Sequence, residues 1–363
     1  MKAEAIQKIN EGELDGESTL DFALSHAEKV KEGVLQSWFK KGASRNDKAL
    51  NEFLLIEIIR SILGAEPRCF FVLLSVSRRL RALLDLKYVD DLERYKYFKR
   101  KIKNLKGRLR EISKRSLGTE GDESFAFDSS IVTADLNGYR NGKKVKKGDY
   151  GVRFTYSTTK GTVIGFQTLL LFNLEKFSVR KFEIYPIDAS TKKMWKEMVC
   201  DEIGTKGGKK KTVIADGGFF AYENYIQSAN HRIESIINPR CDCRENLKEK
   251  LENMSPRLEL FEIHDPEKKE KVMGEMKDLV SSIIEKSLNY DEYKKKRSTI
   301  EKIFKIAKQI YGVKDLHVYH EEGAHWKIFI GFYFSCLLYQ DLKDEKINVD
   351  KAVGLFADNT DVW

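Results

Sequence analysis

The stretch TVIADGGFFAYENY (212–225) carries the signals that decide the fold. Its apolar, β-branched start predicts a buried strand, the two glycines predict a turn, and the aromatic residues that follow have helical character. Asp216 stands between the strand and the turn. A carboxylate at the rim of an apolar sheet costs roughly several kcal/mol unless a cation meets it. We therefore expect a basic side chain or a metal ion to face Asp216.

The 363-residue chain has an ordinary globular composition with a surplus of basic residues. Charged residues make up 33% and the formal net charge is +9, which favours a polyanionic partner. The five cysteines are odd in number and scattered, which argues against a disulfide framework. The longest apolar run, 328–339, is shorter than the roughly 18 residues that a membrane span needs, and the N-terminus has no leader pattern. We expect a cytoplasmic protein of a prokaryote, associated with the nucleoid and not with a membrane.

Residues 1–117 contain helix patterns and no strand pattern. Apolar spacing predicts core helices over 51–64 and 69–86. The segment 93–115 holds 11 Lys or Arg against 2 Glu, a net charge of +9. Such a run can be a solvated face, but the interleaved aromatic residues favour a helix that binds phosphates. Four of its residues are our candidates for DNA contact: Lys99, Arg100, Lys101 and Lys103.

After residue 118 the pattern changes to strands that are separated by turns and helices. We expect strands at 124–134, 151–159, 162–174, 181–188, 212–216 and 232–240, and a long helical region at about 267–311. This order indicates an α/β fold with a mixed sheet.

Three acidic residues stand out by position. Asp128 lies inside the first apolar strand, Asp216 ends a later strand, and Glu301 lies on a helix. At about 100° per residue, Arg297, Glu301 and Lys308, with Tyr293, fall on one stripe about 80° wide. A lone acid in a strand is usually a turn or hydrogen-bonding residue. This triplet is how a ribonuclease-H-like sheet gathers three carboxylates, where two divalent metal ions would catalyse phosphoryl transfer.

The blocks around these acids resemble the DDE transposases of bacterial and archaeal insertion sequences. Arg297-x3-Glu301-x6-Lys308 fits the Tyr-x2-Arg-x3-Glu-x6-Lys motif of one large group, with Tyr293 one residue farther from the arginine than in that motif. FDSSIV and IADGGFFAYEN resemble the blocks around the first and second Asp, and IINPR resembles the strand that follows. Together these blocks cover about 120–340.

The resemblance implies a ribonuclease-H-like mixed sheet flanked by helices. It implies an N-terminal helical, DNA-binding domain over 1–117 and a catalytic domain over 118–345. A helical insertion at about 241–285 is expected beside the active site, and 346–363 would be a tail. The partners would be double-stranded DNA, as terminal inverted repeats and as target, and a second copy of the chain in the DNA complex.

The same resemblance assigns roles to residues. Asp128, Asp216 and Glu301 would hold two Mg²⁺ ions, with Mn²⁺ as a substitute. Arg297, Lys308 and Tyr293 would hold phosphates next to the scissile bond. The transposase would cleave phosphodiester bonds at transposon ends and join the 3′ ends to target DNA. Two other readings stay open: a DNA-binding protein derived from a transposase that no longer cuts, and a nuclease that cuts without strand transfer.

Two basic loops and one histidine-rich stretch remain. The loop 137–149, with Lys143 and Lys144, and the loop 204–211 are expected to contact the DNA backbone, although each can also be a solvated turn. The stretch HVYHEEGAHW (317–326) matches no metal-ligand pattern, so we expect it at a surface or helix end, with a turn between two helices at Gly323.

Overall fold

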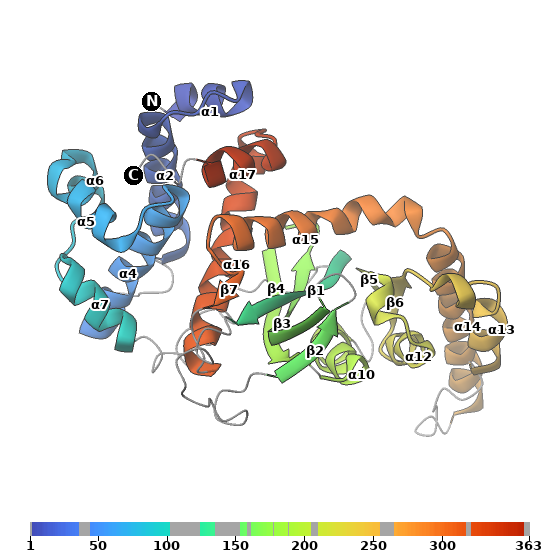
Figure 1. The fold of residues 1–363 in the computed structure, drawn as a ribbon. Coiled ribbons are helices and arrows are strands. Elements are labelled where there is room, and N and C mark those ends of the chain that lie inside the picture. Colours follow the sequence, from blue (N-terminus) through green and yellow to red (C-terminus); the bar gives the residue numbers. More distant parts are fainter. Residues whose placement is uncertain are drawn as a thin grey trace. The chain divides into compact units, whose positions relative to one another are not determined.

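The computed structural model describes residues 2–35, 44–101, 124–134, 153–157, 161–176, 178–187, 189–204, 210–254, 265–316 and 321–358 (Figure 1). They belong to two compact units, each discontinuous in sequence. The helical unit comprises Met1–Leu117, Val132–Val152 and Lys302–Trp363, and the sheet unit comprises Gly118–Ile131 and Arg153–Glu301. The expected border at 117 coincides with a border between these units, whereas the expected border at 345 does not, because residues from Lys302 onward join the N-terminal helices.

The N-terminal part of the helical unit consists of α1 (Lys2–Glu11), α2 (Gly16–Val30), η1 (Lys31–Leu35), α4 (Arg45–Ile62), α5 (Pro67–Val76), α6 (Arg78–Leu84) and α7 (Leu92–Lys101). The single helix expected over 69–86 is broken at Ser77, whose backbone is extended with φ −85° and ψ 109°. Its hydroxyl accepts a hydrogen bond from the Leu80 backbone N–H at 3.3 Å and so begins α6. Ser77 therefore ends α5 and caps α6, although the apolar pattern continues across it.

The C-terminal helices α16 (Glu321–Asp344) and α17 (Val349–Asp358) complete the helical unit. The rings of Phe22 on α2 and Phe356 on α17 stack with centroids 5.2 Å apart. Buried His26 of α2 contacts Asp341 of α16, with Nδ1 and Oδ2 3.0 Å apart. Part of the segment expected as a tail, 346–363, is therefore a packed helix. Among the described residues, no helix combines the length and apolar character needed to cross a bilayer.

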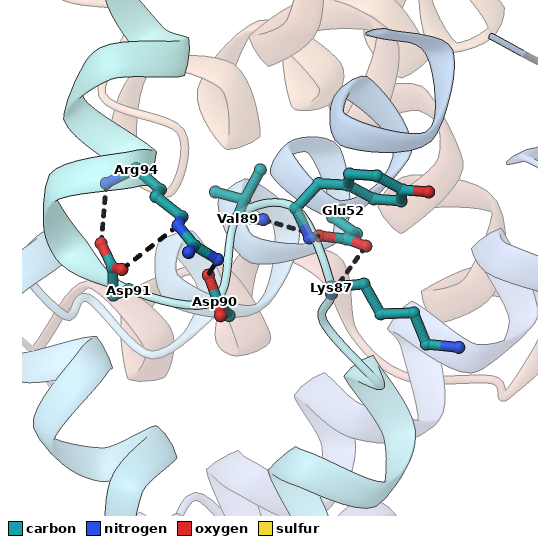
Figure 2. Close-up of polar contacts among 7 residues, drawn as sticks. Glu52, Lys87, Val89, Asp90, Asp91 and Arg94 are labelled. Atoms are coloured by element: carbon teal, nitrogen blue, oxygen red, sulfur yellow. Dashed lines mark hydrogen bonds and ion pairs between the residues drawn. The ribbon is translucent and has the colours of Figure 1, made fainter. Parts of the chain in front are cut away.

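Helix α7 is held on α4 by backbone hydrogen bonds to one carboxylate. Glu52 of α4 accepts hydrogen bonds from the backbone N–H groups of Lys87, Tyr88 and Val89 at 2.8–2.9 Å (Figure 2). Asp91 then caps α7 by accepting from the Arg94 backbone N–H at 2.7 Å. These contacts fix the loop before α7 and the start of the helix itself.

The sheet contains β1 (Ser124–Ala134), β2 (Arg153–Ser157), β3 (Gly161–Asn173), β4 (Ser178–Pro186), β5 (Lys211–Ala215), β6 (Ile233–Ile237) and β7 (Asp315–Leu316). Its order is β2-β3-β1-β5-β6, with β4 beside β3 and β7 beside β1. Strands β1, β5 and β6 are parallel, whereas β2 and β4 pair antiparallel with successive parts of β3. This mixed sheet with flanking helices confirms the expected ribonuclease-H-like α/β fold.

The remaining described helices are α10 (Thr191–Trp195), η3 (Lys196–Cys200), α11 (Asp201–Ile203), η4 (Gly217–Phe219), α12 (Tyr222–Asn230), η5 (Cys241–Cys243), α13 (Leu247–Met254), α14 (Pro266–Leu288) and α15 (Asp291–Gln309). Phe125 and Phe127 of β1 share one core with α10, η3, α12, α13 and α14. The described parts of the expected insertion, 241–254 and 265–285, consist mainly of η5, α13 and α14. However, α14 packs in this core, on the sheet face that carries Phe127 and not on the opposite face, which carries Asp128.

Candidate active site

Parallel pairing places two of the three acids side by side. In the β1–β5 register, Phe127 lies opposite Ala215, so the next residues along these strands are Asp128 and Asp216. Side chains alternate between the faces of a strand. Because Phe127 and Ala215 belong to the helix-covered core, both carboxylates fall on the other face. A smaller apolar cluster there contains Ile214, Ile236 and Tyr290, the last at the start of α15.

The glycines after β5 leave room for the Asp216 carboxylate. Asp216 caps η4 by accepting a hydrogen bond from the Gly218 backbone N–H at 2.8 Å. A Cβ atom at Gly218 would lie 2.9 Å from Asp216 Oδ1, and one at Gly217 would lie 3.2 Å from the Asn238 carbonyl oxygen. Neither glycine has a positive φ, so a left-handed turn does not explain them. The pair allows the chain to turn tightly around the carboxylate.

Arg297 joins the first acid to the third. Its Nη1 donates to Asp128 Oδ2 at 2.6 Å, and its Nη2 donates to Glu301 Oε1. The Arg297 and Asp128 side chains are only 10% and 8% exposed, whereas Glu301 is 55% exposed. A basic side chain is therefore the cation that meets the acids here. It comes from α15, one helical turn before Glu301.

The site has more negative than positive charge. Burial and the nearby charge of Asp216 raise the pKa of Asp128 to about 7, against the opposing effects of Arg297 and of the Ser129 backbone N–H. Glu301 adds to the rise. Among these described residues, three carboxylates stand against one guanidinium, which contacts Asp128 and Glu301, so this group carries a net charge of −2 when all three acids are ionised. Such a site attracts a further cation.

A family model for the transposase DDE domain matches residues 119–337, a range that includes all three acids and Arg297. The chain belongs to the transposase DDE domain family. Comparison with curated proteins and with solved structures gave no match. The family membership confirms the expected relationship to DDE transposases, while the group with the Tyr-Arg-Glu-Lys motif stays a prediction.

The acids of the transposase fit a divalent metal ion by chemistry. Carboxylate oxygens are the hard ligands that Mg²⁺ and Mn²⁺ prefer, and the uncompensated charge matches one divalent cation. Within the described ranges, no three Asp, Glu, His or Cys side chains stand in a metal-binding arrangement. Arg297 lies between Asp128 and Glu301 instead. Binding of a metal by all three acids therefore requires Arg297 to release at least one of them.

Sequence reasoning missed Tyr290 of the transposase. Its side chain is buried beside Arg297, and its hydroxyl lies close enough to act as a hydrogen-bond partner of that guanidinium, although within the described residues no hydrogen bond of normal geometry joins them. Burial raises the pKa of Tyr290 to about 12, with Arg297 acting against the rise and Asp216 and Asp128 adding to it. Tyr290 precedes the first residue of α15, so the helical spacing that groups Arg297 with Glu301 does not extend to it. Tyr293 packs instead against the apolar cluster of Tyr290.

The other candidates belong to the helical unit or lie outside the described residues. Lys308 is on α15, about two turns beyond Glu301, and is half-buried. Lys99, Arg100 and Lys101 are on α7 of the helical unit. Three candidates lie outside the described residues: Lys103, Lys143 and Lys144.

The histidine-rich stretch differs from its expected form. Gly323 lies in the first turn of α16 and does not separate two helices. His325, in the same helix, is buried. His317 and His320 lie outside the described residues. In the part of the chain that is described, this stretch supplies no metal-ligand cluster.

Proposed function

We propose that the transposase cleaves phosphodiester bonds at the ends of a mobile DNA element and joins the 3′ ends to target DNA. Asp128, Asp216 and Glu301 would hold two Mg²⁺ ions, which Mn²⁺ can replace. The observation that carries this proposal is the pairing of Asp128 with Asp216 across adjacent parallel strands, with buried Arg297 linking Asp128 to Glu301. A purely structural ion pair would need only one acid for Arg297, whereas three acids are gathered here.

The chain's own residues divide the work between binding and positioning. Bound metal ions would activate a water or 3′ hydroxyl and stabilise the leaving oxygen. Asp128 and Asp216 are held by rigid strands, which suits ligands that must not move. Arg297 is a bidentate donor, so it can exchange a carboxylate for a phosphate oxygen of the scissile strand. Lys308 lies farther along the same helix and would hold a neighbouring phosphate.

The partners follow from this chemistry. The substrates would be duplex DNA in two forms, the terminal inverted repeats of the element and the target. Two ends must be cut and joined together, so two copies of the chain would act in one DNA complex. In a prokaryotic cell this work belongs in the cytoplasm, at the nucleoid.

Cleavage and joining on end-bearing DNA test the proposal. A duplex that carries the inverted repeats flanking the coding region is incubated with Mg²⁺ and a supercoiled target, and cut and joined products are measured. We expect Asp128→Ala, Asp216→Ala and Glu301→Ala each to lower both products by about a thousandfold or more, because loss of a ligand loses the metal. Folding and DNA binding should persist.

The matched control is Glu223→Ala, which removes an acid of the same unit that pairs with Lys192 on the surface. It should cut and join like the wild type. Robust cutting by any of the three acid variants contradicts the site. Cutting by the wild type without any joined product would leave a nuclease without strand transfer.

A further inference from the structure

Helices α4, α7 and α16 meet around one aromatic ring in the helical unit. The Phe53 ring of α4 lies 5.2 Å from Tyr95 and 5.6 Å from Phe98 of α7, and 5.8 Å from Trp326 of α16, measured between centroids. Lys99 follows Phe98 and Lys327 follows Trp326. Two lysines that are 228 positions apart in the sequence therefore extend from neighbouring points of one aromatic contact.

A buried ion pair lies close enough to both lysines to interact with their charges. Arg60 donates to both oxygens of Glu57, at 2.7 Å from Nε and 2.8 Å from Nη2. The Tyr95 hydroxyl donates to the same carboxylate. Burial acts to raise the pKa of Glu57, but Arg60, Tyr95 and the charge of Lys99 outweigh it and hold the pKa low. Glu57 is thus ionised, and its hydrogen bonds go to Arg60 and Tyr95.

The two lysines are left with a surplus of positive charge. Arg60, Lys99 and Lys327 are three cations around one carboxylate, and among the described residues neither lysine has an ion pair with an acid. Burial, together with the charges of Lys99 and Arg60, lowers the pKa of Lys327. Lys99 is exposed and Lys327 is half-buried, so a ligand can reach them. An anion would relieve this repulsion.

We propose that Lys99 and Lys327 together bind one phosphate of the DNA backbone where α7 meets α16. A phosphodiester suits the site because it carries one negative charge and offers two free oxygens, one for each ammonium group. The surface continues along α7 with exposed Tyr97, whose ring lies 4.5 Å from the Lys101 ammonium. The assignment of the ligand as DNA rests on the proposed function, whereas the assignment of the basic site rests on the contacts and charges of Lys99 and Lys327.

The site is prepared before a ligand arrives. Glu52 fixes the loop before α7, Asp91 caps the helix, and Tyr95 ties its second turn to Glu57. Lys99 therefore extends from an anchored helix, which lowers the ordering cost of binding. Lys327 comes from the stretch that the sequence assigned to catalysis, so the phosphate site combines residues from both expected domains.

The test compares two double variants with equal charge loss. Lys99→Gln with Lys327→Gln removes the site, and Lys96→Gln with Lys343→Gln removes two exposed lysines of the same helices. Affinity for a duplex is measured against salt concentration in the presence of a chelator, so that catalysis plays no part. The slope of log K against log salt should fall by about 0.9 in the site variant. From 50 to 200 mM salt, the wild type should lose about 3.5 times more affinity than this variant.

The control variant should keep a steeper slope than the site variant, and Lys99→Arg with Lys327→Arg should restore the wild-type slope. Equal slopes in the two glutamine variants would overturn the site and leave only general charge attraction. Failure of the wild type to bind any duplex would count against the proposed function as well. Binding by the wild type with an unchanged slope in the site variant counts against this inference alone.

Thermal unfolding separates a ligand site from a structural ion pair. If the two lysines await an anion, the glutamine site variant should unfold at the wild-type temperature or a higher one, because the repulsion is gone. If their main role is instead to stabilise ionised Glu57, to which the charge of Lys99 contributes, the loss of that stabilisation should outweigh the relief of repulsion. The unfolding temperature of the site variant should then drop below that of the control variant, and the inference would be wrong.

Discussion

Around Arg297, three carboxylates share one guanidinium, and around Glu57, three cations share one carboxylate. Each cluster contains a buried pair of an arginine and a carboxylate, Arg297 with Asp128 and Arg60 with Glu57, and further charged groups of one sign near that pair. A third buried acid, Glu234 of β6, differs from both because each cation beside it, Lys210 and Lys286, is itself paired with the carboxylate. Ser282 and Thr212 donate further hydrogen bonds to it. The comparison teaches that an ion pair alone indicates no ligand. The sign of the charge left over indicates which ligand a site would take.

Removal of the central residue should destabilise both clusters, but to different degrees and with a different response to Mg²⁺. Glu57→Gln leaves three cations without their acid and should lower the free energy of unfolding by about 3–5 kcal/mol. Arg297→Gln should cost less, about 1–3 kcal/mol, because Asp128 can take up a proton. Mg²⁺ should restore the stability of Arg297→Gln and leave Glu57→Gln unchanged. Urea unfolding at pH 7.5 with and without Mg²⁺ measures this, and an equal gain from Mg²⁺ in both variants would break the comparison.

The pH dependence of stability should identify the surplus negative charge. Because the pKa of Asp128 is raised to about 7, the folded chain keeps a proton that the unfolded chain releases above about pH 4. Its contribution to stability therefore falls as the pH rises from about 4 to 7 and is constant above. At 1.36 kcal/mol per pKa unit, the fall has an upper limit of about 4 kcal/mol. Unfolding of the wild type and Asp128→Asn across this range measures it.

Glu223 provides a control of opposite sign for that experiment. Its pKa is lowered by a hydrogen bond from Lys192, so its contribution to stability is present at neutral pH and is lost as the pH falls. The stability difference between the wild type and Glu223→Gln should therefore grow with pH, while that for Asp128→Asn shrinks. Parallel trends in the two variants would refute the assigned pKa of Asp128.

The smallest expected effect concerns two buried tyrosines. The Tyr225 hydroxyl donates to the Ile237 carbonyl oxygen at 2.8 Å, whereas the Tyr290 hydroxyl lies beside Arg297 and makes no hydrogen bond of normal geometry within the described residues. Tyr225→Phe should therefore cost about 1–2 kcal/mol of stability, and Tyr290→Phe less than about 0.5 kcal/mol. Chemical unfolding measures both. A loss in Tyr290→Phe as large as in Tyr225→Phe would mean that the hydroxyl supports the acidic centre through a hydrogen bond.

The strands and the acids could be predicted because their signals are local. Alternation and β-branched residues mark β1 and β5, and a charge inside each apolar run marks Asp128 and Asp216. Helical periodicity then placed Arg297 and Glu301 on one stripe, one turn apart, as the structure has them. Tyr290 escaped because it precedes the first turn of α15, where a helical motif no longer describes the side chains.

The rest depends on contacts that no local pattern encodes. The break at Ser77 competes with an apolar pattern that continues on both sides of it. Lys327 is one charge at the start of an apolar helix, and its relation to Lys99 exists only because Trp326 packs on Phe53. The same holds for α14, whose place in the core on one sheet face could not be read from its amphipathic pattern. Long-range packing decides these positions.

The discontinuity of the helical unit sets an order in time. During synthesis, α7 leaves the ribosome long before α16, because 228 residues separate Lys99 from Lys327. At about 5–20 residues per second, this interval is about 10–50 s. Until then α2 also lacks its partners Asp341 and Phe356. A nascent chain thus holds half of the basic site, and only a chain translated through α16 can complete the proposed phosphate site.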